Sequence, residues 1–317
     1  MNIKNIVIAG AGTMGYSMAQ IFAKYHYNVI IYDLSEKALE NAKERIHENV
    51  ETMINEKEMS REQACDLIKH LSYTKEKLCF ENCDIVIESI VENLNIKRNF
   101  YREISRIVKD ETILATNTSG LSINAISEAV YKPERFIGMH WFNPSHLILL
   151  IEIIKGDQTS NEIAKIIYDL SLAINKKPVI VNQDVPGFVA NRIQFAVLRE
   201  ALYLVEKGVV SKEGIDDIMK YGLGFRYACL GPLEVADFGG LDTFHHISEY
   251  LMKDLCDSHE VPQLLNECYR QGYLGVKTKK GFYDYSDNRD MKATQQRDEK
   301  LLKLFHAMYT SEKDSSL

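Results

Sequence analysis

Residues Asn5–Gly15 read NIVIAGAGTMG, an apolar run that leads directly into three closely spaced glycines. The run Asn5–Ala9 is rich in β-branched residues and predicts a strand, whereas the apolar residues of Met14–Tyr25 recur at helical spacing. The GxGxxG pattern therefore falls in a turn between a strand and a helix. The unpaired N–H groups at the start of such a helix bind phosphate well. The predicted phosphate-binding residues are Gly10, Gly12, Thr13, Met14 and Gly15.

Each glycine of this turn has a separate physical purpose. Gly10 permits the tight turn, Gly12 lets the backbone approach a pyrophosphate, and Gly15 lets the helix pack closely on the strand. The next apolar run, Val29–Tyr32, ends at Asp33. This is close to the spacing of about 20 residues expected of an acid that binds ribose hydroxyls. Because a carboxylate there repels a 2′-phosphate, Asp33 favours NAD over NADP as the cofactor.

The order of predicted elements indicates two domains. Further strands are predicted at Asp84–Ser89, Thr112–Thr116, Phe136–His140 and Leu147–Ile154, with a helical hairpin from Ser35 to about His70 and a helix at Leu94–Val108. Strands that alternate with helices are typical of a mostly parallel sheet covered on both faces. Beyond Asp184 the strand signal disappears and helices follow, beginning at Asn191–Lys207. We therefore predict a Rossmann-like NAD-binding domain over residues 1–184 and an all-α domain over residues 185–317.

Composition excludes several classes of function. The chain has 317 residues, with 38 Lys and Arg against 45 Asp and Glu, so its formal charge is −7 and nothing suggests a nucleic-acid-binding patch. The six cysteines form no CxxC pair and no Cys/His spacing typical of a metal site, so we expect free, mostly buried thiols and no metal. The most apolar run, Leu147–Ile154, is far shorter than a membrane helix. The N-terminus lacks a basic region, and we expect a cytoplasmic protein without a membrane anchor.

One histidine and one glutamate stand out as a catalytic pair. His140 ends a predicted strand, at the sheet edge where open α/β folds bind ligands. Glu152 is the one charge within the apolar run LILLIEII, and a buried carboxylate is costly unless it is paired. A His–Glu couple meets that need, because the carboxylate orients the imidazole and stabilises the imidazolium that forms when the ring takes a proton. The alternatives are a structural strand-end histidine and an edge-strand charge that faces water.

The chain resembles the L-3-hydroxyacyl-CoA dehydrogenases, in particular the short bacterial 3-hydroxybutyryl-CoA dehydrogenases. The resemblance runs from about Ile3 to Tyr285. It rests on ordered motifs, namely GAGTMG, IESIVENLNIK, ATNTSGLSI, GMHWFNP, LLIEIIKG, DVPGFVANRI, GPLEVADFGGLD and GVKTKKGFYDY. It implies an NAD-dependent oxidoreductase of fatty-acid and butanoate metabolism that interconverts (S)-3-hydroxyacyl-CoA and 3-ketoacyl-CoA. It also implies a homodimer that forms through the C-terminal helical domain, which contributes to substrate binding.

The resemblance assigns roles to individual residues. His140 and Glu152 match the family's catalytic pair, and Ser119 and Asn191 match residues that hydrogen-bond the substrate's 3-oxygen. The family's nicotinamide-side contacts match Glu92, Lys97, Asn117 and Lys277. By itself, Lys97 has an ordinary alternative as a solvated helix lysine.

Some segments depart from the family pattern and leave the substrate open. Gly224–Pro232 reads GFRYACLGP, where acyl-CoA enzymes usually have a shorter Gly-x-Pro-x-Gly-Pro form. Similar versions occur in relatives that act on free 3-hydroxy acids, such as L-gulonate and carnitine dehydrogenases, and Arg226 could then pair with a substrate carboxylate. His146 points the same way. A non-catalytic NAD-binding module is a further alternative, but such a module has no reason to keep Glu152 inside an apolar strand.

Overall fold

The computed structural model describes residues 3–309, which fall into the two units Met1–Arg192 and Ile193–Leu317. The strands of the first unit are β1 (Asn5–Ala9), β2 (Asn28–Tyr32), β3 (Leu71–Thr74), β4 (Ile85–Glu88), β5 (Ile113–Thr116), β6 (Phe136–Trp141), β7 (Leu150–Ile154) and β8 (Lys177–Val181). Within the described residues they form one eight-stranded sheet in the order β3-β2-β1-β4-β5-β6-β7-β8. All neighbouring pairs are parallel except β6 and β7, which are antiparallel. The mostly parallel sheet predicted from the sequence is confirmed.

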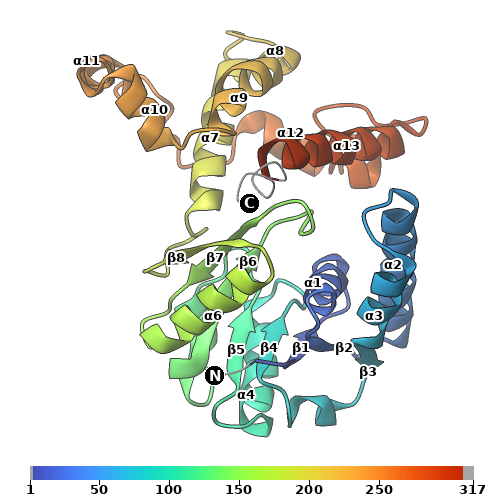
Figure 1. Cartoon of the computed structure of the whole chain (residues 1–317). Coiled ribbons are helices and arrows are strands. Elements are labelled where there is room, and N and C mark those ends of the chain that lie inside the picture. Colours follow the sequence, from blue (N-terminus) through green and yellow to red (C-terminus); the bar gives the residue numbers. More distant parts are fainter. Residues whose placement is uncertain (1–2, 310–317) are drawn as a thin grey trace, which may run out of the picture. The chain divides into compact units, whose positions relative to one another are not determined.

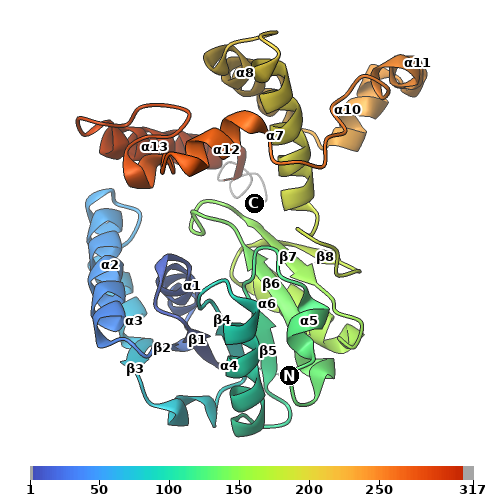
Figure 2. The same cartoon turned by 180° about the vertical axis from the view of Figure 1, so that it is seen from behind.

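Helices cover both faces of this sheet. They are α1 (Thr13–Lys24), α2 (Glu36–Asn55), α3 (Arg61–Lys69), α4 (Leu94–Ile107), α5 (Ile123–Ser127) and α6 (Asn161–Ala173). Figures 1 and 2, drawn from opposite sides, show α1 and α6 against one face and α4 and α5 against the other. The α2–α3 pair is the predicted helical hairpin.

The core follows from the alternation of side chains along the strands. Ile6 and Ile8 of β1 pack in the cluster that contains the apolar residues of α1, α2, α3 and α6. Val7 and Ala9 pack in the cluster on the other face, with α4 and α5. Successive strand residues point to opposite faces, so a strand covered on both sides has a continuous apolar sequence, as Ile6–Ala9 has.

Two strands were not predicted, and both lie at edges of the sheet. β3 has no fully buried residue and most residues of β8 are exposed, so neither carries a continuous apolar run. Pro178 within β8 is typical of an edge strand, because proline cannot donate to the hydrogen-bond ladder.

The second unit is helical. It contains most of α7 (Ala190–Glu206), then α8 (Lys212–Ile218), a π-helical turn (Met219–Leu223), α9 (Gly224–Tyr227), α10 (Pro232–Gly239), α11 (Leu241–Leu251), α12 (Gln263–Arg270), a 3₁₀ turn (Val276–Thr278) and α13 (Arg289–Tyr309). The start of α8 is capped by Ser211, whose Oγ accepts a hydrogen bond from the N–H of Gly214 at 3.0 Å. The all-α character is confirmed, and the boundary after residue 184 stays a prediction.

The expectations about the cysteines and about membrane helices can be compared with the structure. All six cysteines are free thiols, but only Cys83 is buried, so the expectation of mostly buried thiols is wrong. No helix among residues 3–309 has both the length and the apolar character that crossing a bilayer requires.

Candidate active site

The glycine turn connects β1 to α1. Two of its glycines are required by the packing of the backbone, and the third is not. Gly10 has φ +110°, and a Cβ there would lie 2.4 Å from the carbonyl oxygen of Ser89. A Cβ on Gly15 would lie 1.8 Å from the carbonyl oxygen of Gly10. A Cβ on Gly12, in contrast, would meet no protein atom within 4 Å. The fold therefore requires Gly10 and Gly15, whereas Gly12 leaves open space at the start of α1.

This open space suits a dinucleotide phosphate. Gly12 is the N-cap of α1 and no side chain caps the helix, so its first N–H groups face outward without a side-chain acceptor. Thr13 and Met14 form the first residues of the helix, and Thr13 is exposed. A helix N-terminus with accessible N–H groups and no acidic first turn attracts an anion.

Asp33 lies beside the turn, as the sequence predicts. It follows β2, and its Oδ2 accepts a hydrogen bond from the N–H of Ala11 at 2.9 Å. Its Oδ1 accepts one from the N–H of Ser35, also at 2.9 Å. Each carboxylate oxygen keeps a lone pair for a further donor, so the side chain can both brace the turn and receive a ribose hydroxyl.

A buried ion-pair network lies at the end of β4. The ammonium of Lys97 pairs with Glu88 and lies 3.3 Å from Glu92 Oε2. Both Lys97 and Glu88 are fully buried, so the alternative of a solvated helix lysine is wrong. Burial raises the pKa of Glu88 although Lys97 and the hydroxyl of Thr116 oppose that effect. Glu88 was missed by sequence reasoning, although its position within DIVIES places a charge inside a buried strand.

Glu92 extends this network to the segment after β5. Its Oε1 accepts hydrogen bonds from the hydroxyl of Thr118 and, at 3.0 Å, from the N–H of Ser119. Asn117 links three strand ends, because its Oδ1 accepts from the N–H of Trp141 at 2.9 Å and its Nδ2 donates to Ser89 Oγ at 3.3 Å. The predicted residues Glu92, Lys97 and Asn117 thus belong to one connected edge of the sheet.

His140 and Glu152 face each other across the antiparallel pair of β6 and β7. The register sets the two residues directly opposite, and His140 Nδ1 lies 2.9 Å from Glu152 Oε2. Both side chains are buried. The imidazole contacts two aromatic rings, with ring centroids 4.4 Å from Phe142 and 5.7 Å from Phe188. The edge-strand alternative for Glu152, with its charge in water, is wrong.

The second oxygen of Glu152 is held by the backbone. Oε1 accepts hydrogen bonds from the N–H groups of Val189 at 3.1 Å and Ala190 at 2.9 Å. Burial acts to raise the pKa of Glu152, but the hydrogen bonds from His140 and these two amides outweigh it and lower the pKa. Glu152 is therefore a carboxylate at neutral pH. An anion at Nδ1 keeps the proton on that nitrogen, so Nε2 offers a lone pair.

The side chain of Asn191 contacts the backbone of Ser119. The side-chain amide of Asn191 donates to the carbonyl oxygen of Ser119 at 2.6 Å. Asn191 directly follows Ala190, whose N–H is bound to Glu152, so the start of α7 connects both contacts. Ser119 is exposed. Lys277, the remaining predicted residue, lies in the 3₁₀ turn Val276–Thr278 of the second unit.

Comparisons with known proteins agree on one family. Residues 5–185 match the family described as "3-hydroxyacyl-CoA dehydrogenase, NAD binding domain", and residues 187–285 match its "C-terminal domain". A 3-hydroxybutyryl-CoA dehydrogenase of Clostridioides difficile is 35% identical over 89% of this chain and 99% of its own. The expected NAD cofactor is confirmed by these matches.

A second kind of relative matches a larger share of the chain. The 5-formyl-3-hydroxy-2-methylpyridine 4-carboxylate 5-dehydrogenase of Mesorhizobium japonicum is 35% identical over 95% of this chain and 96% of its own. A crystal structure of an enzyme of that activity, titled an NAD⁺-dependent dismutase, superposes with a TM-score of 0.90 at 34% identity, covering 96% of this chain and 98% of that one. The (S)-3-hydroxybutyryl-CoA dehydrogenase of Ralstonia eutropha gives 0.77 at 34% identity, covering 90% and 100%.

Proposed function

We propose that this chain, which belongs to the 3-hydroxyacyl-CoA dehydrogenase family and is an NAD-dependent oxidoreductase, uses His140 and Glu152 to oxidise the 3-hydroxyl of a 3-hydroxyacyl-CoA. NAD, when bound, supplies the hydride acceptor. The glycine turn at Gly12 would hold its pyrophosphate, and the Asp33 carboxylate would hold the hydroxyls of its adenosine ribose. Glu92, Lys97 and Asn117 serve the nicotinamide end.

His140 moves the proton in this proposal. Its Nε2 accepts the proton of the substrate hydroxyl, and none of residues 3–309 hydrogen-bonds to that atom. Glu152 stabilises the imidazolium that results, because its charge lies 2.9 Å from Nδ1 in a buried site. Ser119 and Asn191 hold the substrate oxygen while it changes from hydroxyl to ketone. In the reverse direction the imidazolium returns the proton.

The observation that carries the proposal is that both oxygens of the buried Glu152 carboxylate accept hydrogen bonds, and that one of them faces Nδ1 of His140. Glu152 accepts three hydrogen bonds, from His140, Val189 and Ala190. A charge removed from water costs several kcal/mol unless such partners compensate it. A strand that only had to pack would place an apolar residue here. The arrangement instead fixes the tautomer and the orientation of His140, which is what a general base requires.

A second candidate is the oxidation of a substrate that carries a free carboxylate. The pyridine-carboxylate enzyme matches more of the chain than the CoA-dependent relative does. Arg226 lies exposed on α9, and no acidic side chain among residues 3–309 forms an ion pair with it. A guanidinium without an internal partner can bind a carboxylate through two parallel hydrogen bonds.

The experiment compares substrates at equal concentration. NADH oxidation is followed with acetoacetyl-CoA and, separately, with free 3-keto acids and an aromatic aldehyde that carries a carboxylate. The first proposal predicts that acetoacetyl-CoA has the highest kcat/KM. If only the free acids turn over, the second candidate replaces it.

A variant pair then locates the carboxylate site. If a free acid is the substrate, Arg226→Gln raises its KM, whereas Arg270→Gln, an exposed arginine on α12, leaves it unchanged. If CoA esters are the substrates, neither variant should change the kcat/KM for them. Turnover of no carbonyl substrate would favour the non-catalytic module.

We also propose a homodimer formed through the helical unit. Large apolar side chains of α10 and α11 are exposed, among them Leu233, Phe238, Leu241 and Tyr250, as is Met252 directly after α11. Such a concentration of exposed apolar side chains on neighbouring helices is typical of an interaction surface. Light scattering coupled to size exclusion should give twice the mass of one chain. Phe238→Glu should shift it toward one chain, and a wild-type monomer would contradict the proposal.

A further inference from the structure

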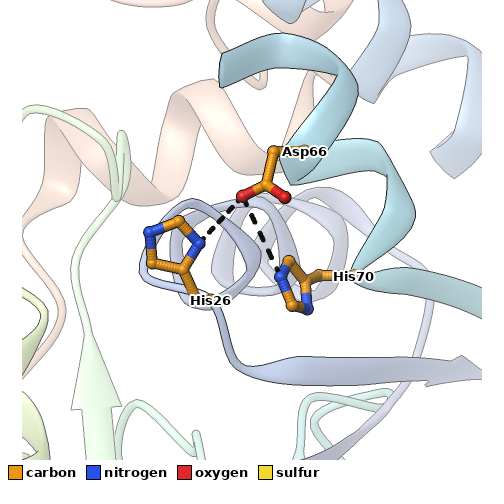
Figure 3. A group of neighbouring side chains, drawn as sticks. All are labelled: His26, Asp66 and His70. Atoms are coloured by element: carbon orange, nitrogen blue, oxygen red, sulfur yellow. Dashed lines mark ion pairs between the residues drawn. The ribbon is translucent and has the colours of Figure 1, made fainter. Parts of the chain in front are cut away.

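Two histidines and an aspartate gather at the surface of the first unit, away from the residues described above. Figure 3 shows Asp66 between the rings of His26 and His70. His26 Nδ1 lies 2.9 Å and His70 Nε2 lies 4.0 Å from the same oxygen, Asp66 Oδ2. These three ligand atoms all lie within 4.8 Å of one another.

The backbone positions all three side chains. Asp66 and His70 are four residues apart at the end of α3, so they share one face of the helix. His26 follows α1 with φ +64°, and its N–H donates to the carbonyl oxygen of Ala23 at 3.0 Å. The turn after α1 therefore presents the ring of His26 to the face of α3.

A neighbouring asparagine determines which nitrogen of His70 carries the proton. His70 Nδ1 lies 3.1 Å from Asn28 Oδ1. The amide nitrogen of Asn28 is engaged with Asn5 Oδ1 at 3.1 Å, so it is the oxygen that faces the ring. Because an amide oxygen can only accept, Nδ1 donates. In the tautomer whose single proton is on Nδ1, Nε2 presents a lone pair to the carboxylate, and these two acceptors need a cation between them.

A cation is the partner that this arrangement lacks. Metal-bound histidines usually donate their second ring N–H to a carbonyl or carboxylate oxygen, which is the role of Asn28 here. In a tetrahedral zinc site, bond lengths of about 2.0–2.1 Å place ligand atoms about 3.3 Å apart. The separations of 2.9 and 4.0 Å lie on either side of that value. The two histidine nitrogens lie within 4.8 Å of each other, so side-chain movements on the order of 1 Å are needed to reach the tetrahedral geometry.

We propose that His26 Nδ1, Asp66 Oδ2 and His70 Nε2 bind one divalent transition-metal ion, with Zn²⁺ as the preferred ion and water as the fourth ligand. Two imidazoles and one carboxylate favour zinc or copper over magnesium or calcium, which prefer oxygen ligands. No ligand spacing in the sequence suggests this site, because the three residues come from two separate segments.

The site is structural in this proposal. The 12 residues of α1 separate His26 from the glycine turn, which is about 18 Å of helix. The ion would tie the turn between α1 and β2 to the end of α3. An ion that binds only the folded state stabilises it. We therefore expect stabilisation of the first unit and no direct effect on turnover.

Calorimetric titration of the untagged, EDTA-treated chain with ZnCl₂ tests the proposal. We expect one Zn²⁺ per chain and, at about 100-fold excess over Kd, a rise in Tm of about 5 °C. His26→Ala, Asp66→Asn and His70→Gln should each lose at least tenfold in affinity. The matched control is His246→Ala, from the exposed group His245, His246 and Glu249 on α11, and it should bind as the wild type does.

Two further readouts keep the test decisive. Co²⁺ in place of zinc should give visible absorption typical of tetrahedral coordination in the wild type and not in Asp66→Asn. The Tm of each metal-free variant shows whether it is folded. Absence of zinc binding by the wild type would overturn the proposal, as would zinc binding that survives Asp66→Asn and His70→Gln or disappears in His246→Ala.

Discussion

Replacing Glu152 by glutamine keeps the shape of the side chain but removes its charge and one acceptor. The wild-type carboxylate accepts from His140 on one oxygen and from Val189 and Ala190 on the other. An amide cannot do both. If its oxygen faces the two backbone N–H groups, its NH₂ faces Nδ1 and forces the proton of His140 onto Nε2. If it turns the other way, the NH₂ opposes two N–H donors.

The expected loss of activity follows from these contacts. A hydrogen bond to a charged group contributes about 1.5–3 kcal/mol. At about 1.36 kcal/mol per factor of ten, loss of imidazolium stabilisation alone lowers kcat about 10- to 150-fold. The wrong tautomer lowers it further, since the comparable change in Ser-His-Asp enzymes costs about 10⁴-fold. We expect kcat of Glu152→Gln to fall between about 10² and 10⁴-fold.

The assay is NADH oxidation with saturating acetoacetyl-CoA, together with NADH affinity from fluorescence titration. Affinity should remain within about threefold of wild type, because Glu152 does not belong to the proposed dinucleotide contacts. Thermal unfolding distinguishes a loss of chemistry from a loss of fold. A kcat within tenfold of wild type in a folded variant would refute the role assigned to the His140–Glu152 pair.

Further predictions concern the turn and a buried lysine. Gly12→Ala should leave the Tm unchanged but weaken NADH binding at least tenfold. Gly15→Ala should lower the Tm by several degrees, because its Cβ would lie 1.8 Å from the carbonyl oxygen of Gly10. Equal losses of Tm in the two variants would contradict this distinction. Burial lowers the pKa of Lys176 to about 8. Between about pH 8 and 10.5 the unfolded chain therefore binds more protons at Lys176 than the folded chain does. Over this range the free energy of unfolding should rise with pH by up to about 3 kcal/mol more in the wild type than in Lys176→Met. Urea unfolding of both proteins across this range measures the difference, and parallel curves would show the reasoning to be wrong.

Much of the fold can be predicted from local sequence, and the features that could not be predicted lack a local signal. The central strands are buried on both faces and give uninterrupted apolar runs such as NIVIA. The edge strands β3 and β8 were missed because each is only partly buried and carries polar residues or Pro178. The antiparallel direction of β7 has no local signal, yet it sets His140 directly opposite Glu152.

For the site, the sequence identifies charged residues in apolar surroundings but not all of their partners. Glu152 was predicted because a charge within LILLIEII needs a counterpart. Its bonds to Val189 and Ala190 could not be predicted, because backbone amides carry no sequence signature. For Lys97 the sequence left open the alternative of a solvated helix lysine, which its buried ion pair with Glu88 excludes. These contacts depend on how the strand ends meet.

The central claim is that His140 carries the substrate proton, and a single-turnover measurement on His140→Ala tests it most directly. Enzyme preloaded with NADH is mixed with the substrate that wild type prefers, and the loss of NADH absorbance is followed in time. We predict that NADH still binds with near wild-type affinity while the turnover phase slows by at least about 10²-fold. A turnover phase as fast as that of wild type would contradict the account.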